Sequence, residues 1–175
     1  KISYFDKTLS KYKLPKIINF NKKLLSNVDI IFTALPNGES QKISKFLLRK
    51  NILIDLSADF RLKNLDTYND SYQITHSCPE YLNKFIYGLS EIYKNQLINA
   101  SNISIPGCYP TSILLALIPL LKANLIDSEN IIIDSKSGYS GAGKKFDENN
   151  IKNNLDFNFF NYNTNNHRHI SEIKQ

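Results

Sequence analysis

The chain has 175 residues, of which 42% are hydrophobic and 22% charged, the balance of an ordinary globular protein. This length allows one large hydrophobic core or two small domains that share a boundary. No apolar run is long enough for a membrane span, and residues 1–16 lack the apolar centre of a signal peptide. We therefore expect a cytoplasmic protein that does not bind membranes.

The formal net charge of +6 raises the question of a nucleic-acid partner. A nucleic-acid interface needs Lys and Arg clustered along one element, whereas here the lysines are scattered along the chain. We interpret the excess of Lys, Asn and Ile as a compositional bias of the source, together with some preference for small anionic molecules. The expected partner is a small molecule rather than a nucleic acid.

The first part of the chain predicts a βαβ unit. Residues 28–34 are mostly apolar and predict a strand, which ends at a Leu-Pro-Asn-Gly turn at 35–38. Residues 39–50 place apolar side chains at helical spacing, and 51–56 predict a second buried strand. A strand, a helix and a strand joined by short links indicate a parallel sheet, and hence an α/β fold.

The second half has a less regular pattern. Residues 60–87 are rich in Tyr, Asn and Asp without a clear period, so we expect irregular chain on the surface or over a site. Short strands are predicted at 103–105 and 131–136, and a buried apolar helix at 111–121. The most natural division falls near residues 104–108, which gives domains at 1–105 and 106–175.

Cys108 follows a predicted strand and the tight turn of Pro106 and Gly107, and it precedes a predicted helix. A thiol at this point lies over unpaired backbone N–H groups and the positive end of the helix dipole. We expect its pKa to fall below the free value of about 8.5, as suits a nucleophile. The alternative is a small buried hydrophobic residue at a strand–helix junction, the common fate of a free cysteine.

Cys78 is interpreted as an incidental thiol, because it lies in the irregular stretch before Pro79. A zinc site built from His76, Cys78, His167 and His169 is conceivable by residue type. However, His-x-Cys and His-x-His lack the spacing usual in structural zinc sites. We expect no metal.

Residues 137–145 follow a predicted strand and contain three glycines, two serines and two lysines. Consecutive N–H groups in such a turn form an anion-binding nest that suits a phosphate or a nicotinamide ribose. A plain flexible loop is the alternative, since glycine-rich turns recur in many proteins.

His167 and His169 flank Arg168, and on an extended strand both imidazoles would point to one face, with Arg168 opposite. A histidine beside Cys108 would accept its proton and later return one to a developing alkoxide. The alternative is a solvated surface segment.

Six stretches, in this order and spacing, resemble the N-acetyl-γ-glutamyl-phosphate reductase family. They are FTALP at 32–36, DLSADFR at 55–61, YGLSE at 87–91, PGCYPT at 106–111, SGYSGAG at 137–143 and HRHISEI at 167–173. The resemblance implies part of a Rossmann-type parallel sheet, followed by part of an α+β catalytic domain like that of glyceraldehyde-3-phosphate dehydrogenase. It also implies NADPH-dependent reduction of N-acetyl-glutamyl 5-phosphate to the semialdehyde in arginine biosynthesis, through a Cys thioester, by a homodimer or homotetramer.

The resemblance also implies roles for particular residues of this sequence. Cys108 matches the family's nucleophile, and His169, or failing that His167, matches its acid/base. The expected cofactor-binding residues are Ala34, Leu35, Pro36, Ser140, Gly141 and Ala142. Arg61 and Arg168 are expected to contact the substrate's anionic groups.

The chain departs from the family's pattern in several places. Asn37 replaces a common histidine, Ser90 and Ser171 replace prolines, and Lys144 replaces an arginine. All six glycines lie at residue 38 or later, so the glycine-rich phosphate turn expected after the first strand is absent. We therefore expect a fragment that lacks both ends and binds NADPH poorly by itself. Aspartate-semialdehyde dehydrogenase and a non-catalytic remnant of the fold are the alternatives.

Overall fold

The computed structural model describes residues 7–48, 51–138, 141, 159, 161–164 and 166–175. Within these ranges, four strands form one sheet in the order β1-β2-β4-β3, and every neighbouring pair is parallel. The strands are β1 (Ile30–Thr33), β2 (Ile52–Asp55), β3 (Ile86–Tyr87) and β4 (Asn102–Ser104). The predicted α/β fold with a parallel sheet is confirmed.

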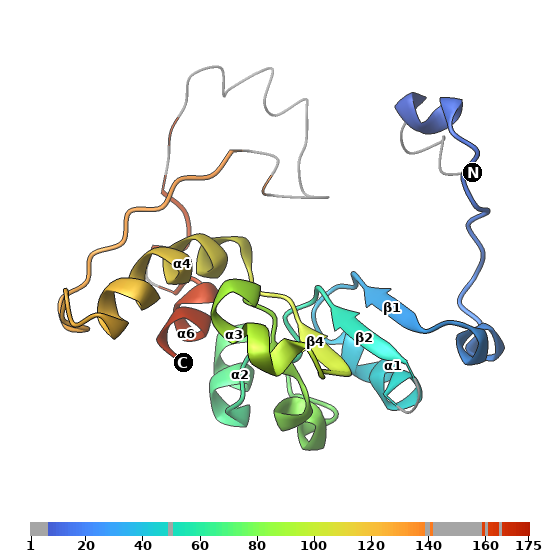
Figure 1. Cartoon of the computed structure of the whole chain (residues 1–175), viewed down its shortest axis with the longest axis horizontal. Helices are drawn as coiled ribbons and strands as arrows, with labels where there is room; N and C mark the ends of the chain where they lie inside the picture. Colours follow the sequence, from blue (N-terminus) through green and yellow to red (C-terminus); the bar gives the residue numbers. More distant parts are fainter. Residues whose placement is uncertain (1–6, 49–50, 139–140, 142–158, 160, 165) are drawn as a thin grey trace.

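Helices connect these strands and follow them (Figure 1). The α-helices are α1 (Glu39–Leu47), α2 (Leu65–Tyr72), α3 (Ser90–Leu97), α4 (Cys108–Lys122) and α6 (His169–Lys174). The described residues also form the short 3-10 helices η2 (Lys7–Lys11), η3 (Lys22–Asn27) and η4 (Pro79–Lys84). In the described part of the chain, no helix is both long and apolar enough to cross a bilayer.

The register of the strands brings their carboxyl ends to one edge of the sheet. Asp55 at the end of β2 pairs with Thr33 on one side and with Ser104 on the other. Ser104 also pairs with Tyr87 at the end of β3. The loops that follow all four strands therefore start at the same edge, which is where ligands bind in open parallel sheets.

Much of the hydrophobic core comes from residues 60–87, the segment predicted to be irregular. Phe60 and Phe85 are fully buried and stack with ring centroids 4.0 Å apart, and Tyr68 of α2 is also fully buried. The expectation of irregular chain at 60–87 is thus wrong, since this stretch contains α2, η4 and β3. These elements have two to eight residues, which is too short for a hydrophobic period to show in the sequence.

The strand predicted at 131–136 does not form. No described segment pairs with these residues, and Ile132 is 94% exposed. β-propensity reflects packing on a half-buried sheet, so an apolar run without a neighbouring strand has nothing to stabilise it.

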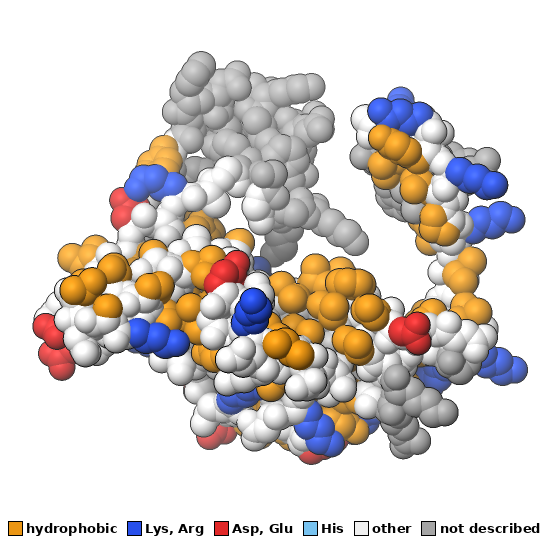
Figure 2. All heavy atoms as spheres, in the orientation of Figure 1, with side chains coloured by type: hydrophobic (Ala, Val, Ile, Leu, Met, Phe, Trp, Pro, Cys, Tyr) orange, Lys and Arg blue, Asp and Glu red, His pale blue; other side chains and the backbone are white. Residues whose placement is uncertain are grey.

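Part of the sheet surface remains apolar and exposed. In β1, Ile30 and Phe32 are 52% and 67% exposed, and hydrophobic side chains gather over this region in Figure 2. Residues 12–21 form no helix or strand, and Figure 1 shows this segment running away from the sheet toward η2.

Candidate active site

Helix α4 begins at Cys108, as the sequence predicts, and the thiol is exposed there. Gly107 is the N-cap residue, and its carbonyl accepts hydrogen bonds from the N–H and the hydroxyl of Thr111, both at 2.9 Å. Pro110 lies in the first turn, where a missing N–H costs nothing. Among the described residues, the N–H groups of Cys108 and Tyr109 have no hydrogen-bond partner, so this end of α4 faces the thiol with free donors.

His169 begins α6 and lies against the turn that carries Cys108. A Cβ built on Gly107 would lie 2.6 Å from Nε2 of His169, so the imidazole occupies the space that a side chain at 107 would need. The rings of His169 and Tyr109 are 6.0 Å apart. His169 thus lies beside both chain neighbours of Cys108.

The two imidazoles come together through a helix and not through a strand. Arg168 has right-handed helical dihedral angles and His169 is already in α6, so the extended conformation considered for this triplet is not adopted. The ring centroids of His167 and His169 are nevertheless 4.8 Å apart, and Nδ1 of His167 accepts the N–H of His169. Arg168 is exposed.

Burial controls the protonation of this pair. His169 is 6% exposed, and its burial, followed by the charges of His167, Arg168 and Arg61, lowers its pKa from 6.5 to about 4. The pKa of His167 is also lowered, by burial and then by Arg168. His169 is therefore neutral at pH 7 and in the form that accepts a proton. Its buried Nδ1 has no hydrogen-bond partner among the described residues.

Arg61, expected to contact a substrate, lies inside the molecule with a protein partner. Its Nη1 is 3.3 Å from a carboxylate oxygen of Glu172 and its Nη2 donates to the Leu56 carbonyl at 3.0 Å. Glu172 is fully buried and was not singled out by the sequence reasoning. The only signal for it was its place in the HRHISEI stretch, three residues after His169.

The expected cofactor turn, Ala34 to Pro36, is exposed at the carboxyl end of β1. Two buried carboxylates hold the chain on either side of it. Asp55 accepts the hydroxyl of Thr33 at 2.6 Å, and Asp59 accepts the N–H of Gly38 at 2.7 Å. The turn is thereby fixed at the same sheet edge as the loop before Cys108.

The glycine-rich loop is only partly described. Ser140 and Ala142 lie outside the described residues, while Gly141 donates its N–H to the Gly138 carbonyl at 3.0 Å. The hydroxyl of Tyr109 donates to Ser137 at 2.9 Å. The start of this loop therefore lies beside the helix turn that carries Cys108.

The second cysteine is chemically different. Cys78 is fully buried, and burial, followed by the charge of Glu80, raises its pKa to about 11. His76 shares a hydrogen bond of 2.8 Å between its Nε2 and the carbonyl of Asp59. Within the described ranges, no group of three or more His, Cys, Asp and Glu side chains is arranged to hold a metal ion.

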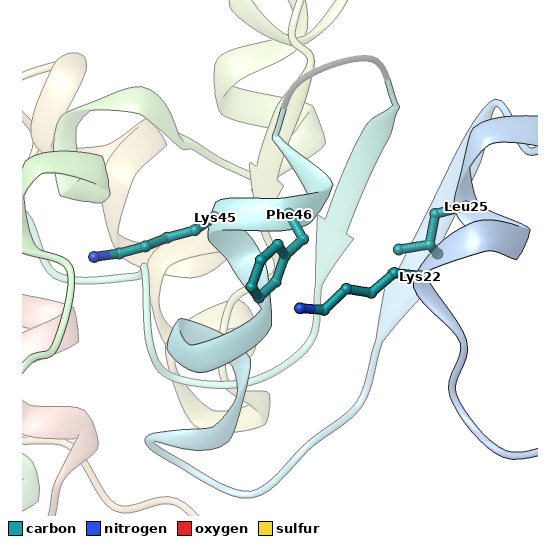
Figure 3. Close-up of a pocket in the computed structure, with 4 residues that line it drawn as sticks. All are labelled: Lys22, Leu25, Lys45 and Phe46. Atoms are coloured by element: carbon teal, nitrogen blue, oxygen red, sulfur yellow. The ribbon is translucent and has the colours of Figure 1, made fainter.

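Two hollows in the surface lie apart from these residues. One, of about 360 Å³, is lined by Lys22, Leu25, Lys45 and Phe46, with the Lys22 ammonium over the Phe46 ring (Figure 3). The other, of about 370 Å³, lies between α4 and residues 131–135. Neither is lined by an expected site residue.

The parallel sheet and the loops at its carboxyl edge define an α/β protein whose ligand site is expected at that edge. Residues 1–100 match the family model "Semialdehyde dehydrogenase, NAD binding domain", and residues 108–175 match "Semialdehyde dehydrogenase, dimerisation domain". The first match covers more than half of the chain. The chain therefore belongs to the semialdehyde dehydrogenase family.

Several curated relatives carry the name of one enzyme. N-acetyl-gamma-glutamyl-phosphate reductase of Ehrlichia ruminantium is 44% identical over 99% of this chain and 50% of its own length. The enzyme of that name from Caldicellulosiruptor bescii is 48% identical over 97% of this chain and 50% of its own length. A probable chloroplastic enzyme of that name from Oryza sativa is 44% identical over 93% of this chain and 39% of its own length. The chain thus spans about half the length of the curated relatives it matches, or less.

The residues present fit one end of a nicotinamide cofactor. The turn after β1 is exposed at the carboxyl edge, which is where ligands bind in open parallel sheets, and Cys108 lies at the same edge. A glycine-rich turn for the pyrophosphate is not among the residues of this chain, because its first glycine is Gly38.

Proposed function

We propose that this chain carries the cysteine-bearing part of an NADPH-dependent reductase of N-acetyl-glutamyl 5-phosphate. The products are N-acetyl-glutamate 5-semialdehyde and phosphate, a step of arginine biosynthesis. One observation carries the proposal: an exposed thiol, Cys108, begins a helix at the carboxyl edge of a parallel sheet, and a buried neutral imidazole, His169, lies against the preceding residue. The names of the relatives support the choice of substrate.

In the first step, the sulfur of Cys108 attacks the acyl-phosphate carbonyl. A C–S bond forms, the bond from carbon to the phosphate oxygen breaks, and phosphate leaves. His169 is suited to take the thiol proton because its lowered pKa keeps it neutral at pH 7. The resulting thioester divides one difficult reduction into two easier steps.

In the second step, the thioester carbon becomes the aldehyde carbon. When bound, the reduced nicotinamide supplies a hydride to that carbon. His169 returns a proton to the oxyanion, and the proton moves back to the sulfur when the C–S bond breaks. Overall one hydride and one proton are consumed: the hydride becomes the aldehyde hydrogen, and the proton leaves on the phosphate.

The start of α4 has donors for the developing oxyanion. The N–H of Gly107 is engaged by Glu172, Pro110 has no N–H, and that of Thr111 is bonded to the Gly107 carbonyl. This leaves the N–H groups of Cys108 and Tyr109 as the donors at the first helical turn. Backbone donors held at a fixed place stabilise a transition-state charge most effectively.

The remaining assignments belong to the same proposal. The turn at 34–36 and the loop at 140–142 approach NADPH, and the exposed Arg168 is better placed than the paired Arg61 to meet a substrate anion. His169 is preferred over His167 as the acid/base because its ring lies against Gly107. The dimerisation-domain match supports a homo-oligomer, dimer or tetramer, which we place in the cytoplasm.

The test uses a protein that carries this chain at the full length of its relatives. NADPH oxidation is followed with N-acetyl-glutamyl 5-phosphate and, as the competing substrate, aspartyl 4-phosphate. We expect oxidation with the first alone, and its loss in C108S with the fold intact. Oxidation with aspartyl phosphate alone would assign the sister enzyme. Full activity in C108S would refute thioester chemistry.

A further inference from the structure

Glu172 holds the end of one strand and the loops after two others at the carboxyl edge of the sheet. Its Oε1 accepts hydrogen bonds from the hydroxyl of Tyr87 at 2.7 Å and from the N–H of Gly107 at 2.8 Å. Its Oε2 pairs with Arg61 at 3.3 Å. These donors follow or end β2, β3 and β4, whereas Glu172 comes from α6, so one carboxylate links four elements.

A buried carboxylate needs an explanation beyond stability. Glu172 is 0% exposed, and removing the two charges of an ion pair from water costs free energy that their attraction often fails to recover. Well-packed apolar residues in place of a buried ion pair are often neutral or stabilising. The ion pair of Arg61 and Glu172 is therefore weak evidence for stability, and its position beside the thiol indicates a geometric role.

The geometry around Gly107 shows what this role is. The carboxylate holds the N–H of Gly107, while Thr111 holds its carbonyl with two hydrogen bonds. Both peptide groups that flank Gly107 are thereby oriented, and they set the direction in which the next side chain, that of Cys108, leaves the backbone. His169 lies one turn before Glu172 on the same helix, so the same contact also sets the separation of imidazole and thiol.

We propose that Glu172 is a positioning residue for Cys108: by holding the Gly107 peptide, it keeps the thiol over the free N–H groups of α4 and beside His169. This rests on the proposed function, in which Cys108 is the reacting group. Arg61 and Tyr87 complete the arrangement by directing the two carboxylate oxygens. Glu172 touches neither substrate nor cofactor in this role.

The experiment measures the rate of alkylation of both cysteines of this chain by iodoacetamide at pH 7, with each site followed by mass spectrometry. Cys108 reports on positioning, whereas the fully buried Cys78 reports on unfolding within the same sample. In E172A we expect Cys108 to react about tenfold more slowly. A displacement of the thiol by a fraction of an ångström takes it away from the backbone N–H groups at the start of α4. In E172Q, where an amide oxygen still accepts the Gly107 N–H, we expect a loss of about threefold or less.

A matched control tests whether docking of α6 alone explains the effect. The hydroxyl of Ser171, next to Glu172 in the same helix, accepts a hydrogen bond from Ser71 at 2.7 Å and does not touch Gly107. S171A loosens the docking without changing the peptide contact, so we expect no change in the rate at Cys108. An equal slowing in S171A and E172A would overturn the proposal, and so would an unchanged rate in E172A with Cys78 still protected.

Two further measurements of the alkylation rate cover the remaining outcomes. If E172A exposes Cys78, then Y87F decides, because it removes one donor and leaves the ion pair intact: slower alkylation of Cys108 supports positioning, and an unchanged rate overturns it. If the unaltered Cys108 reacts no faster than a free cysteine at pH 7, the proposed function fails first. If Cys108 reacts rapidly in the unaltered chain and slowly only in the Glu172 and Tyr87 variants, the positioning role is tested separately from the proposed function.

Discussion

Replacing Gly107 with alanine tests the close packing around the thiol. The backbone of Gly107 has φ −65° and ψ 160°, which alanine adopts without strain, so the only cost of the substitution is contact. The new Cβ would lie 2.6 Å from Nε2 of His169 and 3.0 Å from Nη1 of Arg61. Ordinary contacts of a Cβ begin near 3.4 Å, so His169 must retreat by roughly 0.8 Å. Because it is 6% exposed, it has little room to do so.

Two consequences of G107A are expected. Overpacking of this kind lowers the free energy of unfolding by about 1–3 kcal/mol, which a urea titration detects. Displacement of the imidazole by nearly 1 Å lowers kcat/KM of the full-length reductase about 100-fold, with a smaller effect on KM. Gly88→Ala is the matched comparison, since its Cβ would meet Ile103 at 2.9 Å in the sheet and not the imidazole. A G107A protein with unchanged stability and unchanged kcat would refute the reasoning.

Three further predictions follow from buried polar groups. The pKa of His169 falls from 6.5 to about 4 on folding, so protonation favours the unfolded chain. The free energy of unfolding should therefore drop by up to about 3 kcal/mol as the pH falls from 6.5 to 4. Urea titration at each pH should show a smaller drop in H169Q. An equal pH dependence in H169Q would contradict this. Asp59→Asn should cost about 2–4 kcal/mol by the same titration at pH 7. Oδ1 of Asp59 accepts the N–H of Gly38 and the hydroxyl of Tyr68, and Oδ2 accepts the N–H of Gln41, so an amide, which has only one oxygen, leaves at least one of these donors unpaired. Stability equal to that of the parent would disprove this. Cys78→Ala should lower stability by about 1 kcal/mol and leave the alkylation rate of Cys108 unchanged; a changed rate would mean that the two thiols are coupled.

The parts of the fold that the sequence predicts are those with a strong local signal. The strand at 30–33, the helix from Glu39 and the strand at 52–55 follow from two apolar runs and one amphipathic stretch around a turn. The start of α4 follows from proline and glycine placed before a long apolar run. These signals depend on neighbours in the sequence and need no knowledge of the tertiary structure.

The parts that could not be predicted depend on distant residues. The apolar run at 131–136 looks like a strand, but only a neighbouring strand can make it one, and none is present in the described part of the chain. The sequence pattern of the histidine pair does not distinguish an extended segment from a helix, and α6 forms where Glu172 meets donors from distant parts of the chain. Apart from its place in the HRHISEI stretch, Glu172 carries no local signal, because its role arises from residues far away in the sequence.

The contacts of Glu172 also bear on the order in which the molecule folds. They join residues separated by 65, 85 and 111 positions, counted to Gly107, Tyr87 and Arg61 respectively. Closing loops of this size costs entropy that only the finished contacts repay. We therefore expect the surroundings of the thiol to be completed late, so that a nascent or partly folded chain carries an ordinary cysteine until α6 docks.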